Sequence, residues 1–268
     1  MKINQLEDNL GIPLFEQVGK KIYLAEAGCE SRNYSRSIAQ QLNEIETVLL
    51  RRKGMEHGNL KISVASTANY FATQLLASFS QRHPQIKISL DVTNRETLLH
   101  QLANNEIDMV IMGQPPAGND LNAESFMENP LVVIAPPQHL LTNKSAITLT
   151  ELQDETFLLR ESGSGTRNAM ERFFNTHGIA PKTSMTMNSN EAIKQAVQAG
   201  LGLGVVSLYT LEMELAIKRL TVLNVVDFPI LRHWYVVHRE GKRLSTVAAA
   251  FKEFLLQEAN SLIKPVSS

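Results

Sequence analysis

The spacing of apolar residues divides the chain into three stretches. Residues 1–28 predict the end of one helix, a tight hairpin and the start of a second helix. Residues 29–53 are polar, contain no glycine or proline, and carry apolar side chains at alternating spacings of four and three. That spacing is typical of a helix that pairs with another helix. The apolar seam consists of Tyr34, Ile38, Leu42, Ile45 and Leu49.

A helix with so narrow an apolar stripe has nothing nearby in the sequence to be buried against. We therefore expect the seam to join two copies of the chain, which this spacing favours over packing on the chain's own domain. The run RRKGMEHG, residues 51–58, then breaks the helix with two glycines and predicts a hinge. Residues 29–57 are accordingly predicted to form a linker and dimerisation helix.

From residue 59 onward, strand spacing and helix spacing alternate. Residues 60–64 place apolar side chains on one face at strand period, and residues 68–84 repeat them four apart at helix period. Residues 107–113 are a continuous apolar run, as expected of a strand buried on both faces. This order predicts a doubly wound parallel sheet. A second round of elements follows residue 135, so the sequence predicts an α/β fold with two lobes and a cleft between them.

Polar residues at strand-to-helix junctions are the candidates for a binding site, because ligands of open α/β sheets bind at the carboxyl ends of strands. One junction, RESGSGTR, combines two glycines for close backbone approach, the hydroxyls of Ser164 and Thr166, two arginines and a helix start that attracts anions. This combination suits a phosphate or carboxylate. The candidate ligand residues are Ser66, Thr67, Gly113, Arg160, Ser162, Ser164, Gly165, Thr166, Arg167, Ser189 and Asn190.

A plainer interpretation of the same junctions stays open. Ser164 or Thr166 would simply cap a helix, Arg167 would form a surface ion pair, and the hydroxyls near residues 66 and 189 would be ordinary helix caps. The RESGSGTR stretch is not a Walker loop, since no lysine follows its second glycine, and it is not a Gly-x-Ser-x-Gly nucleophile elbow.

Composition narrows the class of protein. The 268 residues have a net charge of −1, and the single cysteine, Cys29, excludes a disulfide framework. No metal-ligand spacing, catalytic constellation, membrane span or export signal occurs in the sequence. We expect a cytoplasmic protein that is not an enzyme, uses no cofactor or metal and contacts no membrane.

The stretch INQLEDNLGIPLFEQVGKKIYLAEAG, residues 3–28, resembles the second half of the winged helix-turn-helix of LysR-type transcriptional regulators. That family has a DNA-reading helix ending in LE-x-x-LG, then PLFE, a basic hairpin or wing, and L-x-x-AG at the start of a linker helix. The rest of the chain follows the same plan. Five longer blocks are similar to the LysR-type regulators of the Calvin-cycle (RuBisCO) operon: residues 94–116, 128–141, 157–174, 189–202 and 228–245.

The resemblance implies a two-lobed, periplasmic-binding-protein-like effector domain behind a linker helix and a partial winged helix-turn-helix. It implies a regulator of carbon-fixation genes that is a dimer or tetramer, binds promoter DNA and acts indirectly on RNA polymerase. The effector is expected between the lobes. The candidates are ribulose bisphosphate, phosphoglycolate, phosphoenolpyruvate and NADPH.

The resemblance also assigns DNA contacts. Lys2, Asn4 and Gln5 lie late in the reading helix, and Lys20 and Lys21 lie in the wing. Since the sequence begins inside that helix, we expect a truncated chain that is impaired in DNA binding.

The predicted domains are 1–28 for the partial DNA-binding part, 29–57 for the linker, 58–134 with 237–262 for the first lobe, and 135–236 for the second. Two other classes stay open at this point. One is a cytoplasmic solute-binding or sensor protein of the same two-lobed fold without DNA binding, for which the linker helix would be unexplained. The other is an enzyme on this fold, which would need a catalytic constellation that the sequence lacks.

Overall fold

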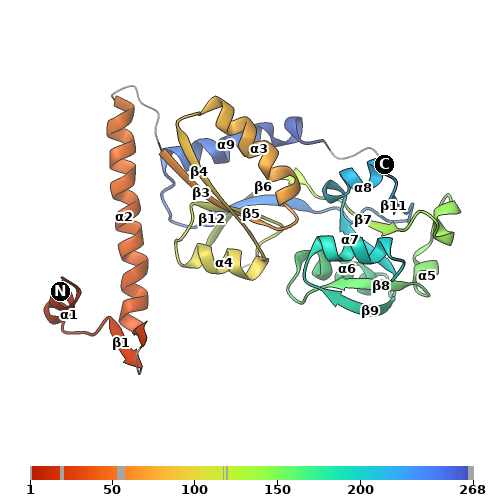
Figure 1. Cartoon of the computed structure of the whole chain (residues 1–268), viewed down its shortest axis with the longest axis horizontal. Helices are drawn as coiled ribbons and strands as arrows, with labels where there is room; N and C mark the ends of the chain where they lie inside the picture. The colour runs from red at the N-terminus through yellow and green to blue at the C-terminus, as the bar shows by residue number, and fades with distance from the viewer. Residues whose placement is uncertain (1, 19–20, 53–57, 117, 119, 265–268) are drawn as a thin grey trace.

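A computed structural model describes residues 2–18, 21–52, 58–116, 118 and 120–264 (Figure 1). A small helix-and-hairpin unit comes first, a long helix follows, and two α/β lobes make up the rest of the chain (Figure 1). The predicted α/β fold with two lobes is therefore present. Among the described helices, none combines the length and the apolar character that crossing a bilayer requires.

The N-terminal unit consists of helix α1 (Lys2–Leu10) and an antiparallel hairpin of β1 (Phe15–Val18) and β2 (Lys21–Leu24). The Glu7 carboxylate joins the two, because its Oε1 accepts hydrogen bonds from the backbone N–H groups of Leu14 at 2.6 Å and Phe15 at 3.0 Å. The helix, hairpin and helix start therefore follow one another as the apolar spacing predicts.

Helix α2 (Glu26–Arg52) packs against this hairpin through Gly28. A Cβ atom at residue 28 would lie 1.9 Å from the carbonyl oxygen of Leu14, far inside van der Waals contact. The absence of a side chain thus allows the helix to touch the backbone that leads into β1, and Leu14 is buried there.

We expect Gly28→Ala to separate the hairpin from α2. Alanine favours a helix over glycine by about 1 kcal/mol, but this gain is smaller than the cost of a collision with backbone. Trypsin cleavage after Lys21 should then accelerate by about tenfold, because local opening exposes the hairpin. Cys29→Ala, an exposed neighbour on the same helix, serves as the control. Equal cleavage rates in both variants would show that the close contact at Gly28 does not hold the hairpin.

The predicted seam of α2 is exposed in a single chain. The side chains of Tyr34, Ile38, Leu42 and Ile45 are all more than half exposed, while the side chain of Leu49 lies outside the described part. Another face of α2 contacts the first lobe through polar groups instead, among them Arg36 and Glu106. Pairing of two copies through the seam stays a prediction.

Lobe I is a five-stranded sheet in the order β4-β3-β5-β12-β6, with helices on both faces. Helices α3 and α9 cover one face, and α4 covers the other. The bounds are β3 (Gly58–Ala65), α3 (Asn69–Arg82), β4 (Ile86–Thr93), α4 (Arg95–Ala103), β5 (Met109–Met112), β6 (Leu121–Glu128), β12 (His233–Arg239) and α9 (Thr246–Leu262). Ser245 caps α9 by accepting from the Ala248 N–H, as the sequence predicts.

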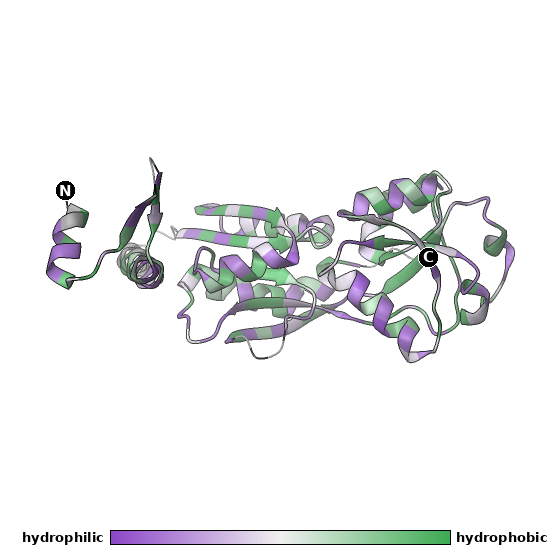
Figure 2. Ribbon diagram, turned by 90° about the horizontal axis from the view of Figure 1, so that it is seen from below, coloured by the Kyte–Doolittle hydropathy of each residue, from purple (hydrophilic) through white to green (hydrophobic). Residues whose placement is uncertain are grey.

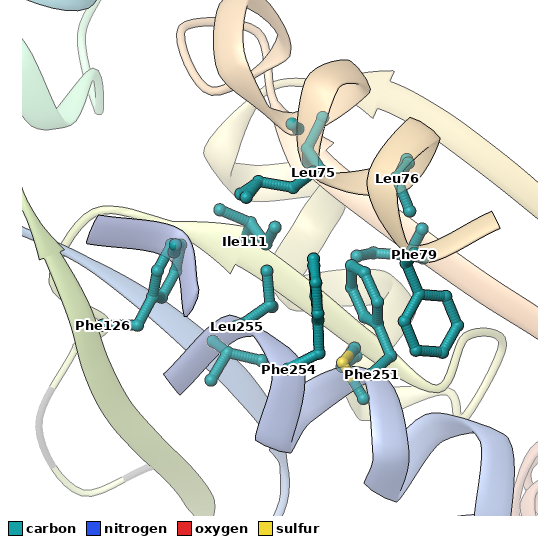
Figure 3. Packing of buried hydrophobic residues seen from close by; sticks show 14 of the residues in the cluster. Leu75, Leu76, Phe79, Ile111, Phe126, Phe251, Phe254 and Leu255 are labelled. Carbon is teal, nitrogen blue, oxygen red and sulfur yellow. The ribbon is translucent and has the colours of Figure 1, made fainter. Parts of the chain in front are cut away.

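The core of lobe I lies between the sheet and the pair α3 and α9 (Figure 3). Phe79 of α3 and Phe251 of α9 meet edge to face with ring centroids 5.0 Å apart, and Phe254 packs beside them. In Figure 2 the central strands are mostly green, whereas the helices around them carry both green and purple positions, as expected of helices with one buried face.

Lobe II has a second five-stranded sheet, in the order β11-β7-β10-β8-β9. Helix α6 packs on one face and α7 on the other, so both sheets are doubly wound as predicted. The predicted parallel direction is wrong for part of each sheet, because β12 pairs antiparallel with β5 and β6, and β7 pairs antiparallel with β10 and β11. The bounds are β7 (Leu131–Ala135), α5 (Leu149–Leu152), β8 (Thr156–Arg160), α6 (Gly165–Thr176), β9 (Lys182–Met187), α7 (Asn190–Gln198), β10 (Leu203–Ser207), α8 (Glu212–Ala216) and β11 (Thr221–Val222). Two short 3-10 helices, η1 (Leu140–Asn143) and η2 (Leu208–Thr210), complete it.

The sheets correct both predicted lobe boundaries. Strand β7 belongs to lobe II, so the first crossing lies at Asn129–Pro130 and not after residue 134. Strand β12 belongs to lobe I, so the second crossing ends before His233 and not after residue 236. The two crossing segments run side by side, since the Asn129 N–H donates to the Arg232 carbonyl at 2.7 Å. A short apolar strand carries no sign of which sheet it joins, because both interiors are apolar.

Candidate functional site

A cleft lies where the two lobes meet, and both crossing segments contribute to it. The empty space in and over the cleft, including space open to solvent, is about 500 Å³. Its lining comes from the carboxyl ends of strands and the helix starts that follow them, the usual position of a ligand in such sheets. The lining residues are Ala65, Ser66, Thr67, Thr93, Asn94, Arg95, Met112, Gly113, Asn129, Arg160, Glu161, Ser164, Gly165, Thr166, Arg232 and Trp234.

Two helix starts without a side-chain cap lie at this cleft, because the segment that leads into α3 (residues 65–67) and the first residues of α6 both line it. Helix α3 begins after Ala68, which has no capping side chain, and α6 begins after Ser164, whose hydroxyl makes no capping bond. The first N–H groups of an α-helix have no partner inside the helix, and the helix dipole adds positive potential. The cleft therefore offers backbone donors to an anion from two directions.

Arg232, from the second crossing segment, places a cation between the lobes. Its Nη1 donates to the Gly165 carbonyl of lobe II at 2.8 Å. Space for the guanidinium depends on two glycines, since a Cβ at Gly113 would lie 2.7 Å from Nη2 and one at Gly165 would lie 3.2 Å from it. Burial above all, together with the charges of Arg95 and Arg172, lowers the pKa of Arg232 to about 10.

Arg95 adds a second cation at the first turn of α4. Its Nη1 donates to the Gln114 carbonyl at 2.7 Å, and burial lowers its pKa. Within the described part of the chain, no carboxylate forms an ion pair with Arg95 or Arg232. Two partly buried cations that repel each other are unfavourable unless an anion joins them.

The two arginines of the predicted site are already paired. Arg160 is buried and makes a bidentate pair with Glu161, at 2.8 Å and 2.9 Å. Arg167 pairs with Glu171 at 2.7 Å, and its Nη1 also donates to the Arg160 carbonyl at 3.2 Å. The positive charge left for a ligand therefore belongs to Arg95 and Arg232 and not to the arginines of the RESGSGTR stretch.

Two buried polar atoms of the cleft wall also lack a partner among the described residues. They are the Asn129 side-chain oxygen and the Trp234 ring N–H. Buried polar groups of proteins are nearly always hydrogen-bonded, so each is a place for a ligand group.

The structure brings seven of the predicted ligand residues together in this cleft: Ser66, Thr67, Gly113, Arg160, Ser164, Gly165 and Thr166. Four others do not line it, namely Ser162, Arg167, Ser189 and Asn190. Ser162 is exposed, and Ser189 caps α7 by accepting from the Ala192 N–H at 3.1 Å. Asn190 is buried, with neither side-chain amide atom bonded to a described residue.

Sequence reasoning missed both unpaired cations. Arg95 follows β4 at a strand-to-helix junction, the same kind of position as the predicted ligand residues. The sequence TNRE at residues 93–96 could therefore have identified it as a candidate. Arg232 had no such signal, because it precedes a strand and reaches the cleft only through the crossing of the chain.

The predicted DNA contacts belong to the N-terminal unit, which lies apart from the two lobes and their cleft (Figure 1). Gln5 on α1 and Lys21 on β2 are exposed. Lys20 and the side chains of Lys2 and Asn4 lie outside the described residues. In the described ranges, no group of three or more His, Cys, Asp or Glu side chains could hold a metal ion.

Comparison with known proteins gives a consistent family. A family model described as the LysR substrate binding domain matches residues 53–260. A RuBisCO operon transcriptional regulator of Allochromatium vinosum is 55% identical over 97% of this chain and 86% of its own length. The HTH-type transcriptional activator CmpR of Synechocystis is 43% identical over 95% of this chain and 84% of its own length.

A solved structure extends the likeness to the fold of the lobes. The regulatory domain of Synechocystis CcmR, in complex with 2-PG, is 44% identical and superposes with a TM-score of 0.73. The match covers 76% of this chain and 98% of that domain.

Proposed function

This chain belongs to the LysR family of transcriptional regulators, and from that premise we propose that it controls carbon-fixation genes in response to a small phosphorylated acid bound between its lobes. The relatives at this level of identity are transcriptional regulators and not enzymes.

The pair of unpaired cations carries the proposal. Arg95 and Arg232 bring two positive charges to a cleft that two uncapped helix starts also line. A phosphate monoester near neutral pH supplies up to two negative charges and several acceptor oxygens, which matches these donors. Hydrogen bonds to charged groups contribute about 1.5–3 kcal/mol each, so a few of them account for micromolar affinity.

Among the effector candidates, 2-phosphoglycolate (2-PG) has the strongest support. It is the ligand bound to the regulatory domain of the related protein CcmR. Phosphoenolpyruvate and ribulose bisphosphate carry the same phosphate chemistry and belong in the same test.

The regulatory step follows from where the lobes meet. An effector that binds both lobes favours the arrangement in which both reach it, by no more than its difference in affinity for the two arrangements. Helix α2 contacts lobe I through Arg36, whose Nη1 lies 2.9 Å from Glu106 Oε1. We propose that this contact passes a change in the lobes to the N-terminal unit, which contacts promoter DNA in an oligomer and so affects RNA polymerase.

A thermal-shift panel tests the effector class. We expect 2-PG to raise the stability of the chain by about 2.7 kcal/mol at 100 times its dissociation constant. Phosphoenolpyruvate, ribulose bisphosphate and NADPH complete the panel. Glycolate, which has the carboxylate without the phosphate, and inorganic phosphate, which lacks the carboxylate, are the controls. If glycolate raised the melting temperature as much as 2-PG, the phosphate group would not be what the cleft recognises, and the proposal would be wrong.

A further inference from the structure

A buried lysine outside the cleft joins the two lobes in a second place. Lys194 of α7 is only 1% exposed. Its ammonium group lies 2.7 Å from Glu191 Oε1 and 2.6 Å from Glu214 Oε1, and it donates to the Thr210 carbonyl at 2.9 Å. Lysine is almost never buried without such partners, because an isolated buried charge is unfavourable.

Part of the enclosure of Lys194 comes from the other lobe. Tyr70 of α3, in lobe I, places its ring 4.8 Å from the Lys194 ammonium group, a cation–π contact. The Tyr70 hydroxyl donates to the carboxylate of Glu191 in lobe II. Next to it, Phe71 of lobe I packs against Tyr209 of lobe II with ring centroids 5.8 Å apart.

The segment that leads into the helix carrying Tyr70 lines the cleft. Thr67 lines the cleft three residues before Tyr70, and α7 begins one residue before Glu191. Separation of the lobes would therefore break the Tyr70–Glu191 bond and would also carry the α3 N-terminus away from α6.

We propose that Tyr70 is a positioning residue, an interlobe latch that acts through Glu191 and Lys194 to hold the cleft in its anion-binding arrangement. Tyr70 does not touch the effector in this proposal. Its effect on effector affinity rests on the proposed function, whereas its effect on the contact between the lobes does not.

The latch makes Lys194 a reporter of lobe separation. While Tyr70 covers it, the amine is shielded from solvent and from an acylating reagent. When the lobes separate, the amine gains access to both. Lys87, on β4, is exposed in the same chain and serves as an internal reference for the reagent.

The test compares Tyr70→Phe with the parent chain and with Tyr23→Phe, which removes a hydroxyl from the exposed hairpin. Brief acetylation followed by peptide mass spectrometry gives the ratio of Lys194 to Lys87 modification. We expect Tyr70→Phe to raise this ratio by about threefold to tenfold, because the lost hydrogen bond is exposed to solvent and therefore of ordinary strength. Titration with 2-PG should show a dissociation constant weaker by a similar factor, and Tyr23→Phe should change neither value.

A second variant guards against a trivial loss of folding. Glu191→Gln alters the exposed partner of the same bond and also removes the ion pair of Glu191 with Lys194. Because Tyr70 acts through Glu191, the double variant Tyr70→Phe with Glu191→Gln should add little to Glu191→Gln alone. An unchanged Lys194 ratio in Tyr70→Phe overturns the latch, whatever 2-PG does. If the ratio rises but the parent chain binds no phosphorylated acid, the latch stands and the proposed function fails.

Discussion

Replacing Arg232 by glutamine is expected to weaken the binding of 2-PG by about 10- to 100-fold, the loss of one strong hydrogen bond to a charged group. Arg232 has no carboxylate partner among the described residues, and its charge is unfavourable beside Arg95 and Arg172. The ligand-free chain should therefore keep its stability or gain a little, whereas removal of a paired arginine would lower it.

The matched control is Arg219→Gln, which removes an exposed arginine of lobe II from outside the cleft lining. Isothermal titration with 2-PG and thermal melts without ligand give both quantities for each variant. If Arg232→Gln bound 2-PG with full affinity, the anion would not contact Arg232, and the proposed position of the anion would be wrong. A large loss of ligand-free stability would make Arg232 a structural residue instead.

Phe251→Ala is expected to lower the free energy of unfolding by about 3–5 kcal/mol. The ring is fully buried between α3, α9 and the sheet, and its edge-to-face contact with Phe79 would be lost with it (Figure 3). Because typical domains are stable by about 5–15 kcal/mol, this one change removes a large part of the stability of lobe I.

Chemical denaturation followed by circular dichroism measures this loss. Leu140→Ala, at a leucine that is 83% exposed, serves as the control and should change the free energy of unfolding by less than about 0.5 kcal/mol. Equal losses in the two variants would contradict the assignment of Phe251 to the core.

Much of the fold followed from local patterns. Strand and helix periods predict both doubly wound lobes, since each element must turn an apolar side toward a core whatever its neighbours are. The hairpin before Gly28 and the Ser245 cap are also local, because a tight turn and a helix start depend on a few adjacent residues.

The boundaries between the lobes depended on more than local pattern. Residues 131–135 form an apolar strand that suits either sheet, and only strand pairing assigns it to lobe II. Residues 233–239 pair with β5 and β6 of lobe I, although the preceding segment lies against lobe II. Register and sheet membership are long-range properties, and one sequence does not reveal them.

The candidate site divides in the same way. The sequence by itself determined that hydroxyls and glycines stand at two strand-to-helix junctions, residues 66–67 and 164–166, because such junctions are local, and the structure brings both to one cleft. Only the tertiary structure decided which arginines keep their charge free for a ligand. Arg160 and Arg167 are neutralised by nearby glutamates, while Arg232 becomes part of the site because the chain crosses twice between the lobes. Whether an arginine is free to bind an anion depends on the carboxylates near it in the folded chain, and the sequence does not show which carboxylates those are.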